Sequence, residues 1–417
     1  MTAILLLLTI GFASPTTDVS AIATNSRLLQ QQPMRLDSTY GCLACHADKR
    51  ASFNQGVHSE RGINCADCHG GDPSVTALPA AHRGRFVGAP DKVATVSLCG
   101  SCHSNPNAMR QYGLPSGMVA EFETSRHGVL LLQRHDHNAP TCTDCHDAHT
   151  IRRPDDARST IYATNIPQTC GRCHEDKALM AQYGLPTDQV EKFTRSAHGI
   201  ALLQKQNFAA PTCLGCHGSH SALPPATTEV ANVCSRCHVQ VGREFEVGPH
   251  GQAARNGKLA GCLGCHDNHD TERVPATQIA ATCSKCHAPG TRAQTLGDAI
   301  QQDVAQAAQD LQAAAAAVAK VARAGRQTGD MEFRYQTART AYLQINQVQH
   351  HLDTDRLEEL TRRVRSISRD LRATAEATAE RNWEHKLWLV PVWFLTLSWL
   401  ALSWLALRRM EGEGNRL

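Results

Sequence analysis

The cysteines of this 417-residue chain occur in a single repeated pattern, which constrains the fold more than any other feature. All eighteen lie between Cys42 and Cys286, as nine pairs whose members are separated by two residues. A histidine follows each pair directly, so the pattern Cys-x-x-Cys-His occurs throughout. The cysteine pairs are Cys42 and Cys45, Cys65 and Cys68, Cys99 and Cys102, Cys142 and Cys145, Cys170 and Cys173, Cys213 and Cys216, Cys234 and Cys237, Cys262 and Cys265, and Cys283 and Cys286. The histidines are His46, His69, His103, His146, His174, His217, His238, His266 and His287.

This pattern is the attachment sequence of c-type haem, in which two thiols bind the macrocycle and the histidine binds the iron. Two alternatives explain it less well. A tetrahedral zinc site draws on two cysteine pairs, and nine pairs do not divide evenly. A disulfide framework needs no histidine beside its cysteines. The sequence therefore predicts nine c-type haems, each with one of the nine histidines as its proximal ligand.

The motifs are dense along the chain, with about 28 residues for each between Gly41 and Gly290. So short a segment cannot bury enough side-chain surface to fold alone, and the macrocycles must supply the apolar interior. Glycine and proline recur throughout this region, which favours short helices joined by long loops. We therefore expect a mainly α fold that depends on its cofactors.

An internal repeat divides the motifs into pairs. The unit Cys99–Thr169 carries Gln111-Tyr112-Gly113-Leu114-Pro115 and His127-Gly128, and the unit that begins at Cys170 repeats them as Gln182-Tyr183-Gly184-Leu185-Pro186 and His198-Gly199. A shorter third unit spans Cys234–Thr282. Each unit holds two motifs, which indicates duplication of a two-haem module.

The thirteen remaining histidines supply candidate second ligands to the irons. His149, His220 and His269 each follow a proximal histidine by three residues, which on a helix places both on one face. They cannot bind opposite sides of the same macrocycle, so we expect each to bind a neighbouring iron. The second motif lacks this spacing, and His82 is its substitute. The candidates are His58, His82, His127, His149, His198, His220, His250 and His269, with His350 or His351 as a ninth. His135 and His137 are also available, whereas Met109 and Met180 are interpreted as packing residues.

The composition changes after Gly290, and long helices are predicted. Asp298–Ala324 is rich in alanine and glutamine and contains neither glycine nor proline. Met331–Lys386 is also compatible with helix, with a possible break at Asp353-Thr354-Asp355, where Thr354 could cap a new start. A hairpin of two long helices is the simplest arrangement for residues 291–386.

Two apolar segments point to a membrane and to export. Residues 387–407 carry no charge and would extend roughly 31 Å as a helix, which matches a bilayer core. Arg408 and Arg409 follow, favouring a cytoplasmic tail at residues 408–417. Residues 1–23, with an apolar run and Ala21-Ile22-Ala23, fit a signal peptide. The haem domain, residues 24–290, is then expected in the periplasm.

The formal net charge of +3 does not describe the predicted holoprotein. Each haem brings two propionates against a ferric centre worth about one positive charge, so the loaded protein is acidic. We expect no nucleic-acid partner.

The Cys-x-x-Cys-His runs, the interspersed His-Gly pairs and Cys-x-x-Cys-His-x-x-His resemble the cytochrome c3-like, doubled-motif multihaem cytochromes of bacterial respiration. The resemblance implies bis-histidine haems that move electrons between the membrane quinone pool and periplasmic or outer acceptors. The long hairpin with a C-terminal anchor is also similar to the octahaem hydroxylamine oxidoreductase and pentahaem nitrite reductase group. This chain lacks the Cys-x-x-Cys-Lys motif of the nitrite reductases. Tyr335 and Tyr342 lie on the relevant helix, but the sequence carries no mark of a cross-linking tyrosine.

Three functional hypotheses follow. The first is an electron-transfer protein, not an enzyme, held by one helix in the bacterial cytoplasmic membrane. A single helix is too little for a quinone site, so a membrane-embedded quinone-linked partner is expected. The second is an oxidoreductase of hydroxylamine, nitrite or sulfur compounds, which needs one five-coordinate haem. The third is an electron-storage protein, which differs from the first only kinetically.

Overall fold

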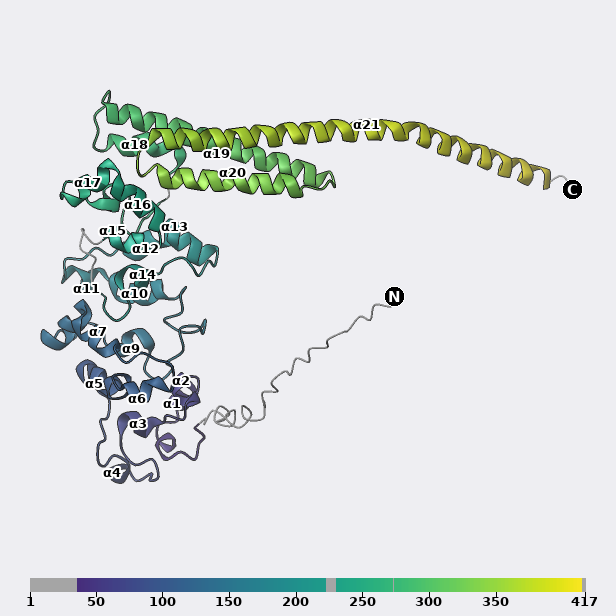
Figure 1. The fold of residues 1–417 in the computed structure, drawn as a ribbon. Coiled ribbons are helices and arrows are strands. Elements are labelled where there is room, and N and C mark those ends of the chain that lie inside the picture. The colour runs from purple at the N-terminus through teal and green to yellow at the C-terminus, as the bar shows by residue number, and fades with distance from the viewer. Residues whose placement is uncertain (1–35, 223–229, 273, 415–417) are drawn as a thin grey trace, which may run out of the picture. The chain divides into compact units, whose positions relative to one another are not determined.

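The computed structural model describes residues 36–222, 230–272 and 274–414 (Figure 1). The predicted signal peptide lies outside these ranges. Within them the chain is helical and contains no strand, which confirms the predicted mainly α class. By internal packing the chain divides into two units, Met1–Glu191 with Ala201–Leu223, and Lys192–Ile200 with Pro224–Leu417.

The first unit contains the first six motifs, on short helices joined by loops (Figure 1). Its helices are η3 (Gly41–Ala44), α1 (Lys49–Phe53), α2 (Val57–Glu60), α3 (Cys65–His69), α4 (Leu78–Ala81), α5 (Lys92–His103), α6 (Pro106–Arg110), α7 (Met118–Thr124), α8 (Arg126–Gly128), the π-helical turn η4 (Val129–Gln133), α9 (Cys142–His146), α10 (Ile166–His174), α11 (Lys177–Ala181) and α14 (Cys213–His217). Two elements cross the division between the units: α12 (Gln189–Arg195) and η5 (Ile200–Gln204).

Side-chain cores in the first unit are small. One cluster has Leu36, Leu43 and Phe53 as its buried members, and another has Val96, Leu131 and Ala139. Clusters of this size bury too little apolar surface to hold so long a segment together. The packing therefore agrees with an interior that is completed by cofactors.

The second unit combines the last three motifs with three long helices. Its short helices are α13 (Ala197–Gly199), α15 (Val230–Ser235), α16 (Val239–Val247), α17 (Pro249–Arg255), η6 (Gly261–Gly264), η7 (Ala276–Gln278) and α18 (Ile279–Ser284). Its long helices are α19 (Arg292–Arg323), α20 (Gly329–Val348) and α21 (Thr354–Gly414), which pack side by side (Figure 1).

The seam between these helices follows a heptad pattern. The buried positions of α19 that follow this pattern are Ile300, Val304, Ala307, Ala314, Val318 and Val321, with Leu311 partly buried among them. The matching positions of α21 are Leu357, Thr361, Val364, Ser368, Leu371 and Ala375. Alternating steps of three and four residues keep one face of each helix on its neighbour, as in coiled coils. The bundle thus has a larger side-chain core than the clusters of the motif region.

The predicted break in the second arm is present, so the bundle has three helices instead of two. Helix α20 ends at Val348 and α21 begins at Thr354. The capping oxygen comes from Asp353, whose Oδ1 accepts a hydrogen bond from the Arg356 backbone N–H at 3.2 Å, and Thr354 is the first helical residue. Leu352 has φ of +64°, in the left-handed region, and turns the chain sharply between the helices.

Helix α21 continues beyond the bundle as an apolar segment. Leu387–Arg408 is long and apolar enough to cross a bilayer, and none of its most apolar window is buried in the protein. Trp388 and Trp393 are exposed there, and the Arg408 guanidinium lies 4.4 Å from the ring centre of Trp404. The predicted segment 387–407 therefore coincides with a candidate membrane helix, and it continues from the bundle as part of one helix.

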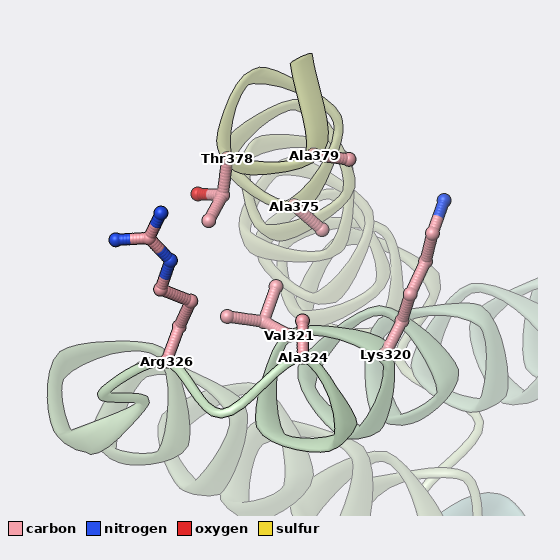
Figure 2. Close-up of a pocket in the computed structure, with 7 residues that line it drawn as sticks. All are labelled: Lys320, Val321, Ala324, Arg326, Ala375, Thr378 and Ala379. Atoms are coloured by element: carbon pink, nitrogen blue, oxygen red, sulfur yellow. The ribbon is translucent and has the colours of Figure 1, made fainter. Parts of the chain in front are cut away.

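A small open pocket lies at the end of the bundle, where the turn after α19 approaches α21 (Figure 2). Val321 and Ala375 contribute apolar walls, with Lys320 and Arg326 beside them. Its lining contains neither cysteine nor histidine, so it is separate from the motifs.

Candidate cofactor-binding site

Five of the six motifs of the first unit adopt one of two local structures, and the first motif begins in the 3-10 turn η3. The second, fourth and sixth motifs each form an isolated helix of five residues, α3, α9 and α14. Capping boxes begin two of them, at Asn64 with Asp67 and at Thr141 with Asp144. The third and fifth motifs instead end longer helices, α5 and α10. In both kinds the cysteines and the histidine share one helical turn and project from one face.

The two cysteines of a motif differ in how far the polypeptide covers them. Every first cysteine is half-buried, namely Cys42, Cys65, Cys99, Cys142, Cys170, Cys213, Cys234, Cys262 and Cys283. Most second cysteines are exposed, namely Cys45, Cys102, Cys145, Cys216, Cys237, Cys265 and Cys286. The other two second cysteines, Cys68 and Cys173, are half-buried.

This exposure bears on what the cysteines can bind. No disulfide joins any of the eighteen cysteines in the described part of the chain, so disulfides do not place them. A thiol packed inside the polypeptide could not reach a haem vinyl group, whereas one at an open surface can. The exposed second cysteines show that the polypeptide alone does not enclose the attachment sites. No observation tests the haem bonds themselves. The bonds of all eighteen cysteines, Cys45, Cys102, Cys173, Cys216 and Cys237 among them, therefore stay predictions.

Opposite most proximal histidines stands a second imidazole. Seven such pairs have ring centres 6.0–6.3 Å apart. They are His58 with His103, His69 with His149, His127 with His174, His146 with His220, His198 with His238, His250 with His287, and His266 with His350. A metal–imidazole bond of about 2 Å, plus the ring radius, gives about 6 Å between two imidazoles on opposite sides of one iron. The spacing therefore fits bis-histidine haems.

The pairs follow a rule that depends on the motif. The third, fifth, seventh and ninth proximal histidines face a histidine that precedes them in the chain. The second and fourth face one that follows, and His149 and His220 lie opposite His69 and His146. As the sequence argument required, neither faces the proximal histidine of its own motif. The histidine comes instead from the next motif but one.

Several of these imidazoles are oriented through their other ring nitrogen. Nδ1 of His69 lies 2.7 Å from the Gly88 carbonyl oxygen, and Nδ1 of His350 lies 3.3 Å from that of Gln347. Nδ1 of His198 lies 3.2 Å from the Thr271 hydroxyl. Occupying Nδ1 leaves Nε2 for the iron and fixes the ring plane.

Burial favours the form of histidine that binds a metal. Burial lowers the pKa of His127, His146 and His350, and the facing imidazole lowers it further in each case. A lowered pKa keeps the imidazole neutral, and only the neutral ring has a lone pair for iron.

A glycine follows His127 and His198, at the point where the short helix of each histidine packs closely against the preceding helix. A Cβ on Gly128 or Gly199 would stand 1.9 Å from the carbonyl oxygen of Phe122 or Phe193. The recurring His-Gly pair thus lets helices α8 and α13 approach α7 and α12 closely enough to place their histidines. Ser125 and Ser196 accept a hydrogen bond from those glycine N–H groups at 3.0 Å, which adds a cap to each helix.

Neighbouring motifs are in contact through their first cysteines. A hydrogen bond with the thiol of the following motif raises the pKa of Cys99 and Cys170, and one with the thiol of the preceding motif raises that of Cys262. The partners are Cys142, Cys213 and Cys234. The third and fourth, fifth and sixth, and seventh and eighth motifs therefore lie side by side, in agreement with the two-motif repeat.

Four predicted ligands are not in the seven pairs. His46 is exposed and faces no imidazole among the described residues, and His82 stacks on Phe86 with ring centres 4.1 Å apart. His217 belongs to the first unit and His269 to the second. The ligand roles of all four stay predictions.

The structure distinguishes the two candidates for the ninth ligand. His350 faces His266, whereas Nδ1 of His351 lies 3.5 Å from the Glu244 carboxylate. Sequence reasoning missed Glu244 and its partner Arg356, because neither belongs to a motif or a repeat. A buried glutamate on a short helix gives no signal until its long-range partner is known.

Two family models match parts of the sequence. Residues 135–179 match the family model for the doubled CXXCH motif. Residues 14–70 and 233–315 match the model for cytochrome c554 and c-prime. The comparisons with curated proteins and with solved structures gave no match. Nine Cys-x-x-Cys-His motifs, the facing imidazoles and the two family matches together support a multihaem c-type cytochrome family for this chain.

Proposed function

We propose that this cytochrome carries nine haems and transfers electrons along them between a membrane-embedded quinone-linked partner and periplasmic donors or acceptors. The observation that carries the proposal is the set of seven facing imidazole pairs. Iron bound by two histidines has no open position for a substrate, so each such haem can only exchange electrons. The haem supplies one-electron chemistry, and the protein sets its spacing and surroundings.

The residues of this chain have three tasks in that function. The cysteines would hold each macrocycle, the facing histidines would supply both ligands to its iron, and contacts between neighbouring motifs would keep successive haems close. Histidine as second ligand favours a lower potential than methionine does, because a thioether stabilises the ferrous state. A low potential suits exchange with quinones and with respiratory acceptors.

Anchoring in the cytoplasmic membrane, with the haem domain in the periplasm, is part of the proposal. Leu387–Arg408 supports it by length and composition, and Arg408 with Arg409 favours a cytoplasmic end. Attachment of c-type haem follows export, which agrees with this orientation.

The experiment uses the purified full-length holoprotein in quinol-containing vesicles together with a membrane quinol dehydrogenase. The proposal expects the haems to be reduced through the dehydrogenase and reoxidised by a soluble acceptor. A chain that ends at Lys386 should stay in solution and be reduced much more slowly. Equal reduction of both forms would refute the anchored electron-transfer function.

One observation favours a second function, the oxidoreductase of hydroxylamine, nitrite or sulfur compounds. His46 is exposed and faces no imidazole in the described part of the chain, so its haem is the candidate for an open iron. Turnover of nitrite or hydroxylamine, together with a high-spin signal that free imidazole converts to low spin, would establish this function. A holoprotein that shows no turnover of these compounds, and no high-spin signal when oxidised, would exclude this function.

A further inference from the structure

The turn between α20 and α21 brings a ligand from the bundle to a motif of the haem region. His350 lies just after the end of α20, half-buried, with its ring centre 6.3 Å from that of His266 in the eighth motif. In the other six pairs both imidazoles belong to the haem region itself. The eighth haem thus depends on how firmly this turn is held.

A buried carboxylate links the turn to the haem region. Glu244 lies on α16, which begins directly after the proximal histidine His238, and only 5 % of Glu244 is exposed. Its two carboxylate oxygens accept hydrogen bonds from Arg356 Nη1 and Nη2 at 2.9 and 3.0 Å. Gln240 donates a third at 2.8 Å. A two-pronged arginine–carboxylate pair fixes both distance and orientation.

Arg356 is well placed to transmit this constraint. It lies in the first turn of α21, whose start is capped by Asp353, three residues after His350. Its Nη1 also lies 3.5 Å from Nδ1 of His351. Holding Arg356 therefore holds the short segment that carries His350.

A second contact acts on the same segment through the backbone. Gly248 closes α16, and a Cβ there would stand 3.0 Å from the His351 carbonyl oxygen and 3.2 Å from that of His350. A side chain at this position must push the turn away by a few tenths of an ångström. The turn thus contacts α16 at two places, through the Arg356–Glu244 ion pair and through the close packing of its backbone against Gly248.

We infer that Glu244, Arg356 and Gly248 are positioning residues that hold His350 on the iron of the eighth haem, so the bundle that continues into the candidate membrane helix completes the haem array. This inference rests on the proposed bis-histidine function. Without the contacts of Glu244 and Gly248, the turn would be free to move away from α16. An iron bound by His266 would then lose its second ligand.

The test compares four variants of the full-length holoprotein. His350→Gly removes the ligand, Glu244→Ala and Arg356→Ala remove the charged contact, and Gly248→Ala crowds the close-packed one. Asp370→Asn is the control, because it breaks the Arg334–Asp370 pair between α20 and α21, 3.3 Å long and away from the turn. Haem content is measured by intact-mass analysis, and spin state by electron paramagnetic resonance and near-infrared magnetic circular dichroism.

We expect unchanged haem content and one haem converted to high spin in His350→Gly, with low spin restored by free imidazole. Glu244→Ala, Arg356→Ala and Gly248→Ala should convert the same haem in part, also reversibly. The effect of the double variant Glu244→Ala/Arg356→Ala should not exceed that of the larger single one, because both break one interaction.

The possible failures are distinguishable. If His350→Gly converts a haem while the other three variants match Asp370→Asn, the positioning role is refuted and the bis-histidine function stands. If His350→Gly itself leaves the spectra unchanged, His350 is not a ligand, and both the inference and the proposed ligation of this haem are overturned.

Discussion

Replacing Gly128 with alanine gives a direct test of how the facing histidines are placed. The added Cβ would stand 1.9 Å from the Phe122 carbonyl oxygen, whereas real contacts of this kind stay beyond 3.0 Å. The start of α8 must therefore move by at least about 1.1 Å. His127, the preceding residue, moves with it, and its ring centre now lies 6.2 Å from that of His174.

A displacement of this size is about half the length of an iron–imidazole bond of about 2 Å. The Phe122 carbonyl belongs to the backbone and cannot move aside as a flexible side chain would. The bond between His127 and the iron must therefore stretch or break. Overpacking of this kind also costs about 1–3 kcal/mol of folding free energy. We expect Gly128→Ala to convert the fifth haem to high spin while the haem content stays the same.

Gly117→Ala is the matched control for this variant. Gly117 directly precedes α7 in the same unit, with φ of −87°, which alanine adopts readily. A Cβ there meets only the Glu121 Oε1 atom, at 3.9 Å. Magnetic circular dichroism at room temperature counts high-spin haems in both variants. If Gly128→Ala gives the same spectrum as Gly117→Ala, the role assigned to the His-Gly pair is wrong.

Two further predictions concern the second unit. Leu371→Ala, at a fully buried position of the bundle, should lower the unfolding free energy by about 2–5 kcal/mol in denaturant titrations, with an unchanged count of low-spin haems. Hydrogen bonds from Arg356 hold the pKa of Glu244 below its usual value of 4.5. Its carboxylate therefore stabilises the fold fully above that value, and the stabilisation is lost as the pH falls through the lowered pKa. The melting temperatures of the native chain and Glu244→Gln should converge on acidification, and a constant difference would contradict this.

Much of the site was predictable because its signals are local. Each cysteine pair and its histidine lie within five residues, so the attachment motif is read directly from the sequence. The three-residue spacing of His149 from His146 led to the prediction that His149 faces another motif, but the helical premise was wrong, because α9 ends at His146 and His149 lies beyond it. The absence of glycine and proline from Asp298–Ala324 and the break at Asp353-Thr354-Asp355 are likewise local properties of the chain.

The pairing of imidazoles was not predictable, because it depends on packing between distant segments. His58 faces His103 of the third motif, although the nearest motif in the chain is the second. His350 and His351 are adjacent and identical in type, and only their long-range contacts, with His266 and with Glu244, distinguish them. Long-range contacts of this kind leave no periodic or compositional trace.

The most direct test of the account is the number of bis-histidine haems per chain in the oxidised full-length protein. Intact-mass analysis gives the haems per chain, and near-infrared magnetic circular dichroism gives the fraction with two histidine ligands. The account predicts nine haems, with bis-histidine ligation in at least the seven whose imidazoles face one another. Fewer than seven bis-histidine haems in a fully loaded chain would contradict it.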